Sequence, residues 1–300
     1  MKVLLVGGLG FIGRRFIRKY SNFHEVIVYS RHKDILAIPY LLNKVIFEEG
    51  ELYENKIFDI LKKHRPDVVI HLAALTGLKK CNEDPETAFK TNVYGTFNVI
   101  TACSTIKCKL IFISSREVYG ETIHDESKEE DPTNPNNVYG ITKMLGEILV
   151  KQENQKHGLD YTILRLTNVY GPEGDQYGSQ VIIKDAITKH KITMLGGNQR
   201  LNYVYVDDVV EVINLVLDNK KSSGEIFNVG SKNTMTIEDF TKEVSKIVGT
   251  NLAIEYLPMR EAETINFKPS IDKLEKILGY TPKTLIEDGI KKTIQWYLEN

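Results

Sequence analysis

The first twenty residues constrain the fold more than any other part of the chain. A short apolar run, Lys2–Val6, leads directly into Gly7, Gly10 and Gly13, and residues 14–20 then have helical character. Such a run is typical of a strand buried on both faces of a parallel sheet. Glycines between a strand and a helix permit a tight turn and let a phosphate approach the helix N-terminus. We therefore predict a dinucleotide-binding strand–turn–helix unit, and the same glycines, followed by two arginines, argue against a signal peptide.

Strand and helix patterns alternate through the first half of the chain. The strand-like runs are Val26–Tyr29, Val45–Phe47, Val68–Leu72, Leu110–Ser114 and Thr162–Leu166. The helix-length segments between them include Ile57–His64, Glu86–Ser104 and Tyr139–His157. This alternation predicts an α/β fold, namely a Rossmann-like, doubly wound parallel sheet with helices on both faces.

The pattern becomes irregular after residue 172. Leu201–Val206 and Glu225–Val229 still have strand character, and we expect them to return to the main sheet. Residues 1–170 and 202–232 are therefore assigned to an NAD(P)-binding Rossmann domain, and residues 171–201 and 233–300 to a smaller, discontinuous substrate-binding lobe. A ligand is expected in the cleft between them, above the carboxyl ends of the strands.

The composition is that of a soluble enzyme. The 39 basic and 40 acidic residues nearly cancel, so nothing indicates a nucleic-acid partner. No apolar stretch reaches transmembrane length, and we expect no membrane association. Cys81, Cys103 and Cys108 are odd in number and lack metal-type spacing, which predicts reduced thiols in a cytoplasmic protein. Asp207 and Asp208 precede an apolar helix-like run, so we expect them to cap a helix and expect no metal site.

Tyr139 and Lys143 stand four residues apart at the start of a predicted helix. Positions i and i+4 share a helix face, so the phenol and the ammonium can point into one site. A free phenol has a pKa of about 10, and a nearby ammonium lowers that pKa and makes Tyr139 usable for proton transfer. The pair alone also fits an ordinary exposed helix face, so its meaning depends on the surrounding motifs.

The ordered motifs of the chain resemble those of the extended short-chain dehydrogenase/reductases, in particular the NAD(P)-dependent nucleotide-sugar epimerase/dehydratase family. The resemblance covers nearly the whole chain. The matching segments, in order, are the glycine motif at 7–13, His71-Leu72-Ala73-Ala74, Asn92 within 91–96, Ser114-Ser115-Arg116-Glu117-Val118-Tyr119-Gly120, Tyr139 with Lys143, residues 165–172, Arg200, and residues 203–208. Each motif is modest alone, and their ordered co-occurrence is specific.

This resemblance implies a role for each motif. Tyr139 would exchange a proton with a sugar hydroxyl while hydride passes between that carbon and a nicotinamide, and Ser115 would polarise the same sugar oxygen. Lys143 would hold the cofactor ribose. The implied cofactor contacts are Gly7, Gly10, Phe11, Ile12, Gly13, Ser30, Arg31, Glu51, Leu52, Leu72, Ala73, Ala74, Asn92, Tyr139 and Lys143. The implied substrate contacts are Ser115, Arg116, Asn168, Gln180, Val181, Arg200 and Arg260.

The resemblance also covers one histidine and a mode of assembly. His71 matches a structural motif, so we expect packing or backbone hydrogen bonding from it, not acid–base work. Members of the family often dimerise through the helices near residues 87–104 and 139–157, which makes a homodimer the expected assembly. The remaining partner is a nucleotide-sugar substrate.

The end of the second predicted strand bears on the choice of cofactor. Proteins that prefer NAD usually place an acidic residue here to accept hydrogen bonds from the ribose hydroxyls. This chain has Ser30 and Arg31 instead, and a hydroxyl and a guanidinium suit a 2′-phosphate better than a carboxylate would. NADP is therefore favoured and NAD remains possible, since Arg31 can also be a solvated surface residue.

Glu117 separates the possible reactions. A UDP-glucose 4-epimerase-like enzyme, our leading interpretation, needs only reversible oxidation at C4, which Ser115, Tyr139 and Lys143 can support. A 4,6-dehydratase or decarboxylase would use Glu117 as a fourth catalytic residue to remove a proton. Arg116 fits the known dehydratase patterns poorly and would weaken that base if the two side chains meet. An NADPH-dependent 4-keto-sugar reductase is a further alternative, and a non-enzymatic cofactor sensor would not need the proton-transfer set.

Overall fold

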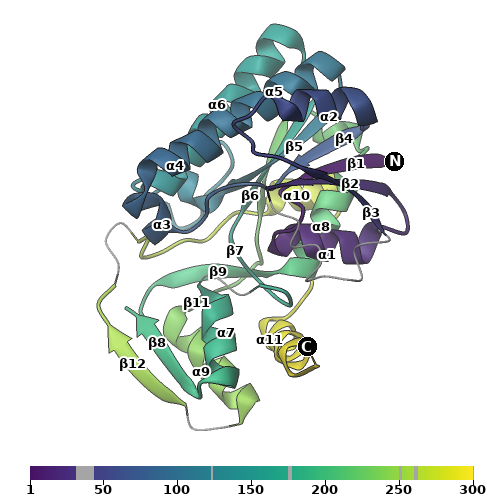
Figure 1. Ribbon diagram of the computed structural model, residues 1–300. Coiled ribbons are helices and arrows are strands. Elements are labelled where there is room, and N and C mark those ends of the chain that lie inside the picture. Colours follow the sequence, from purple (N-terminus) through teal and green to yellow (C-terminus); the bar gives the residue numbers. More distant parts are fainter. Residues whose placement is uncertain (32–43, 123, 175–177, 250–251, 260–262, 300) are drawn as a thin grey trace.

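A computed structural model describes residues 1–31, 44–122, 124–174, 178–249, 252–259 and 263–299. Its larger part is built on a seven-stranded sheet in which every pair of neighbours is parallel (Figure 1). In spatial order the strands are β10 (Glu225–Val229), β6 (Tyr161–Leu166), β5 (Lys109–Ser115), β4 (Val68–His71), β1 (Lys2–Val6), β2 (Glu25–Ser30) and β3 (Val45–Glu49). The strand order reverses between β1 and β4, as in a doubly wound sheet. The predicted fold class is confirmed.

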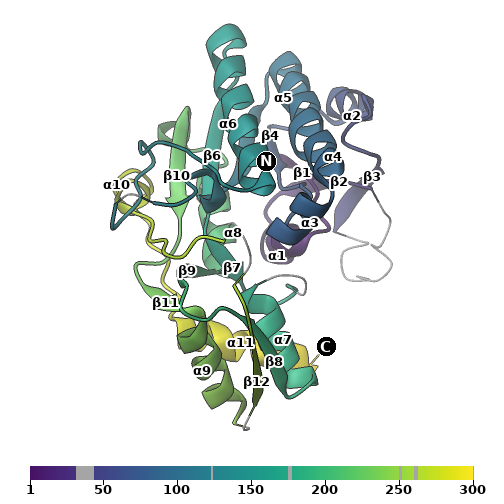
Figure 2. The ribbon, with the colours of Figure 1, turned by 90° about the vertical axis from the view of Figure 1, so that its left-hand side faces the viewer.

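Helices cover both faces of this sheet (Figures 1 and 2). One face packs on α1 (Phe11–Tyr20), α8 (Val206–Leu215) and α10 (Asp272–Leu278), and the other on α2 (Lys56–His64), α5 (Gly95–Ile106) and α6 (Val138–His157). Alternate strand residues supply the two cores: Val3 and Leu5 belong to one, and Leu4 and Val6 to the other. Within the described parts of the chain, no helix has both the length and the apolar character to cross a bilayer.

The segment predicted as one helix over Glu86–Ser104 is a chain of shorter pieces. In order they are α4 (Pro85–Phe89), a π-helical turn η3 (Lys90–Tyr94) and then α5, and a separate short helix, α3 (Leu78–Glu83), precedes them. Asp84 caps α4, because its side chain accepts from the Thr87 N–H, and Pro85 fits the first helical position, where no N–H is needed. The π-helical turn contains Asn92, and such turns are frequent at functional sites.

The smaller lobe lies beyond the carboxyl edge of the main sheet (Figure 2). One sheet contains β7 (Asn168–Tyr170), β9 (Arg200–Tyr205) and β11 (Thr234–Thr236), and another contains β8 (Lys191–Leu195) and β12 (Ala253–Leu257). The lobe's helices are α7 (Ser179–Thr188), α9 (Ile237–Val248) and α11 (Ile286–Glu299). Two short 3₁₀ turns, η4 (Arg116–Val118) and η5 (Lys220–Ser222), follow β5 and precede β10.

Only one of the two late strands returns to the main sheet as predicted. Glu225–Val229 does so as β10, paired with β6, whereas the expectation for Leu201–Val206 is wrong, because β9 pairs with β7 and β11. The residues of β9 alternate between two cores: Val204 packs with the main-sheet core, and Tyr203 and Tyr205 pack with that of the smaller lobe. This strand therefore joins the two parts, and the boundaries at 1–170 and 202–232 stay a prediction.

Candidate active site

The glycine turn after β1 fits the pyrophosphate of a dinucleotide. Gly7 has φ +80°, and its N–H donates to the Tyr29 carbonyl at 2.8 Å. A Cβ on Gly7 would stand 2.7 Å from the backbone of Ala73, so no other residue fits there. Gly10 caps α1 without any side chain, and the first N–H groups of that helix have no intrahelical acceptor. These groups, with the positive end of the helix dipole, are what an anionic phosphate requires.

The residues predicted for the adenosine half lie together beyond β2. Ser30 is half-buried at the end of that strand and Arg31 is exposed. The Tyr29 hydroxyl donates to the Glu51 carbonyl at 2.9 Å, which holds Glu51 beside the strand end. Leu52 is buried beneath α5, where a Cβ on Gly95 would stand 2.7 Å from it. The fold thus brings residues from two separate loops to one edge of the sheet.

The loop after β4 joins the glycine turn. The N–H groups of Leu72 and Ala73 both donate to the Val6 carbonyl at 2.9 Å. Asn92 then holds the loop: its Oδ1 accepts from Leu75 N at 2.7 Å, and its Nδ2 donates to Leu75 O and Thr142 Oγ1 at 3.0 Å each. The Asn92 amide is 2% exposed and is occupied by protein groups, so its contribution to a cofactor site is to position this loop.

His71 has the structural character expected of it. It is buried at the end of β4, and its Nε2 lies 2.9 Å from Thr96 Oγ1. Burial lowers the pKa of the imidazole to about 3, and the nearby Lys143 ammonium acts in the same direction. His71 is therefore neutral at physiological pH, and its hydrogen bond goes to a side chain, not to the backbone.

Ser115, Tyr139 and Lys143 meet at the carboxyl end of β5. Ser115 ends that strand, close enough to the Tyr139 phenol to act on its pKa. Asn137 caps α6 by accepting from Gly140 N at 2.8 Å, which sets Tyr139 in the first turn of the helix. Lys143 follows one turn later, with Nζ 5.9 Å from the centre of the Tyr139 ring. The three predicted catalytic groups thus share one site.

The electrostatics of this centre differ from the sequence prediction in one respect. Burial lowers the pKa of Lys143 to about 8. Burial raises the pKa of Tyr139, and the Glu117 carboxylate raises it further, against the opposing hydrogen bond from Ser115. Burial and the Glu117 carboxylate thus outweigh the lowering of the Tyr139 pKa expected from Lys143 in the protein by itself. The Lys143 Nζ donates to the Ile113 carbonyl at 2.7 Å. Tyr139 is thus a protonated phenol, poised as a proton donor.

Arg116 and Glu117 form a buried ion pair beside this centre. Arg116 Nη2 lies 2.8 Å from Glu117 Oε1, and both side chains are less than a tenth exposed. Asn137 Nδ2 donates to the other carboxylate oxygen, Oε2, at 2.9 Å. Arg116 Nη1 is buried and has no hydrogen-bond partner among the described residues, and the guanidinium carbon lies 5.4 Å from the centre of the Phe267 ring. The two side chains therefore meet, and both carboxylate oxygens of Glu117 are engaged by protein groups.

Four further predicted substrate residues lie on the smaller-lobe side. Asn168 is half-buried on β7 and donates from Nδ2 to the Asn202 carbonyl at 2.9 Å. Gln180, in the first turn of α7, is buried, and neither polar atom of its amide has a partner in the described structure. Val181 beside it is half-buried, and Arg200 is exposed at the start of β9. Arg260 lies outside the described residues.

Asp207 and Asp208 stand in the first turn of α8, where helix-capping was expected. Their side chains make tertiary contacts instead. Asp207 pairs with Arg15 of α1, with Nη2 and Oδ2 2.8 Å apart, and Asp208 accepts from the Tyr280 hydroxyl at 2.6 Å. These carboxylates fasten α8 to its neighbours. The described residues contain no group of three or more metal-ligand side chains placed to share an ion.

Three features of the site escaped the sequence. Asn137 donates to Glu117 and also caps α6. An asparagine just before a predicted helix is a typical N-cap, and that position could have indicated its capping role. Cys81, buried in α3, lies close enough to influence the pKa values of Tyr139 and Lys143, which no spacing indicates. The Ile113 carbonyl that accepts from Lys143 is a backbone group, so the contact could not be predicted from residue type.

The fold is that of dinucleotide-binding proteins, and it brings Ser115, Tyr139 and Lys143 together at the carboxyl end of β5. The profile of the NAD dependent epimerase/dehydratase family matches residues 3–230. A dTDP-D-glucose 4,6-dehydratase from Homo sapiens is 32% identical over 323 residues, covering 100% of this chain and 90% of that protein. The chain belongs to the NAD dependent epimerase/dehydratase family, whose members of this kind are enzymes.

Solved structures agree over the whole length. UDP-glucose 4-epimerase of Thermotoga maritima with UDP-glucose superposes with a TM-score of 0.92 at 29% identity, covering 100% of this chain and 99% of that one. UDP-glucose 4-epimerase of Thermus thermophilus in complex with NAD gives a TM-score of 0.91 at 28% identity, covering 99% of each chain. Epimerases and dehydratases both stand among the similar proteins.

Proposed function

We propose that this protein is a nucleotide-sugar 4-epimerase that acts through transient oxidation at C4 to a keto intermediate. The observation that carries the proposal is the state of Glu117. Arg116 engages one of its carboxylate oxygens at 2.8 Å and Asn137 the other at 2.9 Å. A dehydratase or decarboxylase would need this carboxylate as a base, whereas an epimerase needs only the groups around Tyr139. The engaged carboxylate therefore favours epimerisation over the first alternative.

The site residues can carry out both half-reactions. When bound, the nicotinamide dinucleotide would accept a hydride from C4 and return it. Gly7, Gly10 and the first turn of α1 would hold its pyrophosphate. Tyr139 takes the proton of the C4 hydroxyl during oxidation and gives it back during reduction, and Ser115 donates a hydrogen bond to the same oxygen. The Lys143 ammonium, and the positive charge of an oxidised nicotinamide, would lower the Tyr139 pKa at that stage.

Product analysis in D₂O tests this proposal. The protein is incubated with UDP-, dTDP-, GDP- and CDP-hexoses, and the products are followed by NMR. An epimerase gives a C4 epimer with no deuterium at C5, no loss of water and no net consumption of NADPH. Deuterium at C5 with release of water would establish a dehydratase, loss of CO₂ from a uronate a decarboxylase, and stoichiometric oxidation of NADPH a reductase.

A matched pair of tyrosine variants separates chemistry from folding. Tyr139→Phe removes the proton-transfer phenol, and general acid–base groups contribute about 10²–10⁴-fold to rates, so a loss in that range is expected in kcat. Tyr119→Phe removes a nearby buried phenol whose hydroxyl donates to Asn228 Oδ1 at 2.8 Å, outside the proposed chemistry. It is expected to keep kcat within a few-fold. Full activity in Tyr139→Phe would refute the catalytic role of Tyr139.

We further propose that the protein prefers NADP over NAD. The support is the end of β2, where Ser30 and the exposed Arg31 stand in place of an acidic residue. Arg31→Asp is expected to weaken NADP⁺ binding by about tenfold or more and to leave NAD⁺ binding unchanged or tighter, because a carboxylate repels a 2′-phosphate. Titration calorimetry with both dinucleotides measures this. Equal affinities in the parent protein would refute the preference.

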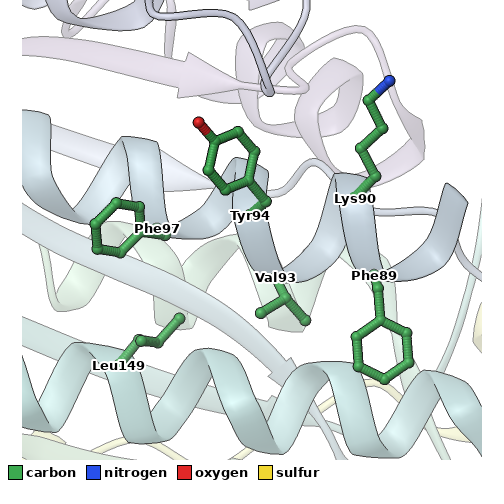
Figure 3. A pocket seen from close by; sticks show the side chains of 6 residues that line it. All are labelled: Phe89, Lys90, Val93, Tyr94, Phe97 and Leu149. Carbon is green, nitrogen blue, oxygen red and sulfur yellow. The ribbon is translucent and has the colours of Figure 1, made fainter. Parts of the chain in front are cut away.

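The assembly we propose is a homodimer formed through the outer face of α5 and α6. Exposed apolar side chains gather there: Tyr94 is 51% exposed, Phe97 44% and Ile148 49%. Val93 of η3 and Leu149 of α6 help to line a hollow of about 440 Å³. Figure 3 shows the two side chains on these facing helices. A contiguous apolar surface of this kind is typical of an interface, and two such helices from each copy would form a four-helix bundle.

Sedimentation velocity tests the dimer. Phe97→Glu places a charge in the centre of this face and is expected to give monomers. Phe23→Glu changes a residue that is 73% exposed elsewhere on the surface, and it should leave the sedimentation coefficient unchanged. A parent protein that sediments as a monomer at micromolar concentration would refute the interface.

A further inference from the structure

Two arginines on α1 reach across to the segment that leads into the smaller lobe. Arg14 and Arg18 stand one turn apart, so their side chains share a helix face. Arg14 Nη2 donates to the Glu173 carbonyl at 2.6 Å, and Arg18 Nη2 forms an ion pair with Glu173 Oε1 at 2.8 Å. Glu173 belongs to residues 171–174, here called the crossing segment, which follows β7. The helix of the glycine turn is thus tied to the entry of the smaller lobe.

Glu173 adopts a backbone conformation that its residue type does not favour. Its φ is +70°, in the left-handed region, and the residue is 5% exposed. Gly and Asn visit this region readily, whereas a glutamate there costs conformational energy. Such residues persist where surrounding contacts hold them, and they cluster at functional sites. The contacts from Arg14 and Arg18 help to hold Glu173 in this conformation.

The other side of the crossing segment touches a predicted substrate residue. Tyr297 of α11 donates its hydroxyl to the Gly174 carbonyl. A Cβ on Gly174 would stand 2.5 Å from Gln180 Nε2, so the amide of Gln180 lies directly against this glycine. Gln180 is 3% exposed in the first turn of α7. Contacts therefore run without a break from α1 through residues 173 and 174 to Gln180.

We propose that Glu173 is a positioning residue for the nucleotide-sugar site. By fastening the crossing segment to α1, it sets Gln180 and the first turn of α7 relative to the dinucleotide side of the cleft. The proposal rests on the proposed function for the identity of the ligand, a nucleoside diphosphate group. Because the contacts end at Gln180 and not at Tyr139, loss of Glu173 affects nucleotide binding and leaves the chemical step intact.

Glu173→Gln tests this role, because it removes the ion pair and keeps the shape of the side chain. The full-length protein, saturated with NAD⁺ or NADP⁺, is titrated with UDP and dTDP by calorimetry, and KM and kcat are measured with the hexose substrate. Nucleotide binding is expected to weaken about five- to tenfold, with a matching rise in KM, while kcat and the dinucleotide Kd stay within about twofold.

The chain offers a matched control on the same helix. Lys19 of α1 pairs with Glu211 of α8 at 2.6 Å, away from the crossing segment. Glu211→Gln removes an ion pair of the same helix whose carboxylate is more exposed than that of Glu173, at 32% against 4%, and it is expected to leave both nucleotide Kd and KM unchanged. Should Glu173→Gln not fold, Arg18→Gln removes the same ion pair from its more exposed side, since the Arg18 side chain is 39% exposed.

Each remaining outcome counts against a specific claim. An unchanged nucleotide Kd in Glu173→Gln, with normal epimerisation, would overturn the positioning role and leave the proposed function standing. Equal weakening of nucleotide and dinucleotide binding would show that the ion pair supports only the general fold. If the parent protein binds UDP or dTDP but does not epimerise the sugar, the proposed function is refuted and the nucleotide titration still tests Glu173. If it binds no nucleoside diphosphate, the proposed function and the positioning role of Glu173 are both overturned.

Discussion

Two buried arginine–glutamate pairs lie near the carboxyl end of the main sheet, and they are built differently. Arg165 of β6 grips Glu147 of α6 with two parallel hydrogen bonds of 2.9 and 2.7 Å, and its Nη1 donates to the Glu129 carbonyl at 3.1 Å. Arg116 instead makes one contact with Glu117 and leaves Nη1 without a partner among the described residues. Both pairs are buried, but the polar atoms of Arg165 have hydrogen-bond partners whereas Arg116 Nη1 has none among the described residues.

The Arg165–Glu147 pair, here called the anchor, holds elements of the fold together, whereas the Arg116–Glu117 pair belongs to the candidate active site. Ser114 also donates to Glu147, at 2.6 Å, so β5, β6 and α6 are fastened together one turn beyond Lys143. Bidentate pairing of this kind is strong and geometrically specific, and it fixes the helix that carries Tyr139. Buried groups left unsatisfied, such as Arg116 Nη1, are rare in folded proteins, and strained electrostatics of this type concentrate at functional sites.

The largest effect is expected from Glu147→Gln. This change leaves the buried Arg165 guanidinium without its counter-charge, and breaking a buried pair in this way costs about 3–5 kcal/mol of unfolding free energy. Urea denaturation measures the loss. The matched control is Glu287→Gln, which breaks an exposed i,i+4 pair with Lys291 and is expected to change nothing measurable. If Glu147→Gln lowers the free energy of unfolding by less than about 1 kcal/mol, the Arg165–Glu147 pair does not have the stabilising role described here.

Lys143 extends the comparison to a buried cation that is held by a carbonyl. Its folded-state pKa of about 8 lies below the ordinary 10.5, so burial of the ammonium destabilises the folded protein fully below pH 8. Between pH 8 and 10.5 the unfolded chain binds more protons than the folded one, so stability rises with pH through this window. This change in stability is expected to be smaller than that caused by Glu147→Gln, because the hydrogen bond to the Ile113 carbonyl at 2.7 Å offsets part of the free-energy cost of burying the ammonium.

Lys143→Met isolates that contribution. The variant lacks the titrating group, so its stability relative to the parent protein is expected to be highest at pH 7 and to decline toward pH 10.5, while kcat falls by about tenfold or more. Urea unfolding at several pH values, on both proteins side by side, gives the difference directly. A difference that does not vary with pH would show that Lys143 is not the buried charge described here.

Much of this molecule follows from local sequence, and the parts that do not are decided by distant contacts. The apolar runs and the glycine turn were enough to predict the parallel sheet, because burial on both faces leaves a plain pattern. Leu201–Val206 has the same pattern yet pairs outside the main sheet, since β10 takes the edge beside β6. Edge competition of this kind depends on residues far away in the chain.

The site divides in the same way. The i,i+4 spacing of Tyr139 and Lys143 follows from helix geometry, and the meeting of both with Ser115 follows from the order of the motifs. The pKa of Tyr139 could not be obtained from spacing, because burial and the Glu117 carboxylate outweigh the lysine. The hydrogen bond from Asn137 to Glu117 likewise could not be predicted, because it depends on the side-chain orientation of a helix-capping residue.

The smallest effect on stability is expected when both members of the weaker pair are replaced. A double variant, Arg116→Met with Glu117→Gln, removes both charges at once, and neutral replacement of a poorly satisfied buried pair changes unfolding free energy by about 1 kcal/mol or less. Arg165→Met with Glu147→Gln should cost clearly more, because the bidentate pair and the hydrogen bond to the Glu129 carbonyl are lost.

The same pair offers a functional measurement. The double variant keeps Ser115 and Tyr139, so epimerisation is expected to persist, whereas the single change Arg116→Met leaves Glu117 held by Asn137 alone and freer to act as a base. Deuterium from D₂O should then appear at C5 of the sugar in the single variant and be absent from the parent and from the double variant. If epimerisation disappears with Glu117 in the double variant, the carboxylate takes part in the native reaction, and the engaged pair is a resting state of a catalytic base.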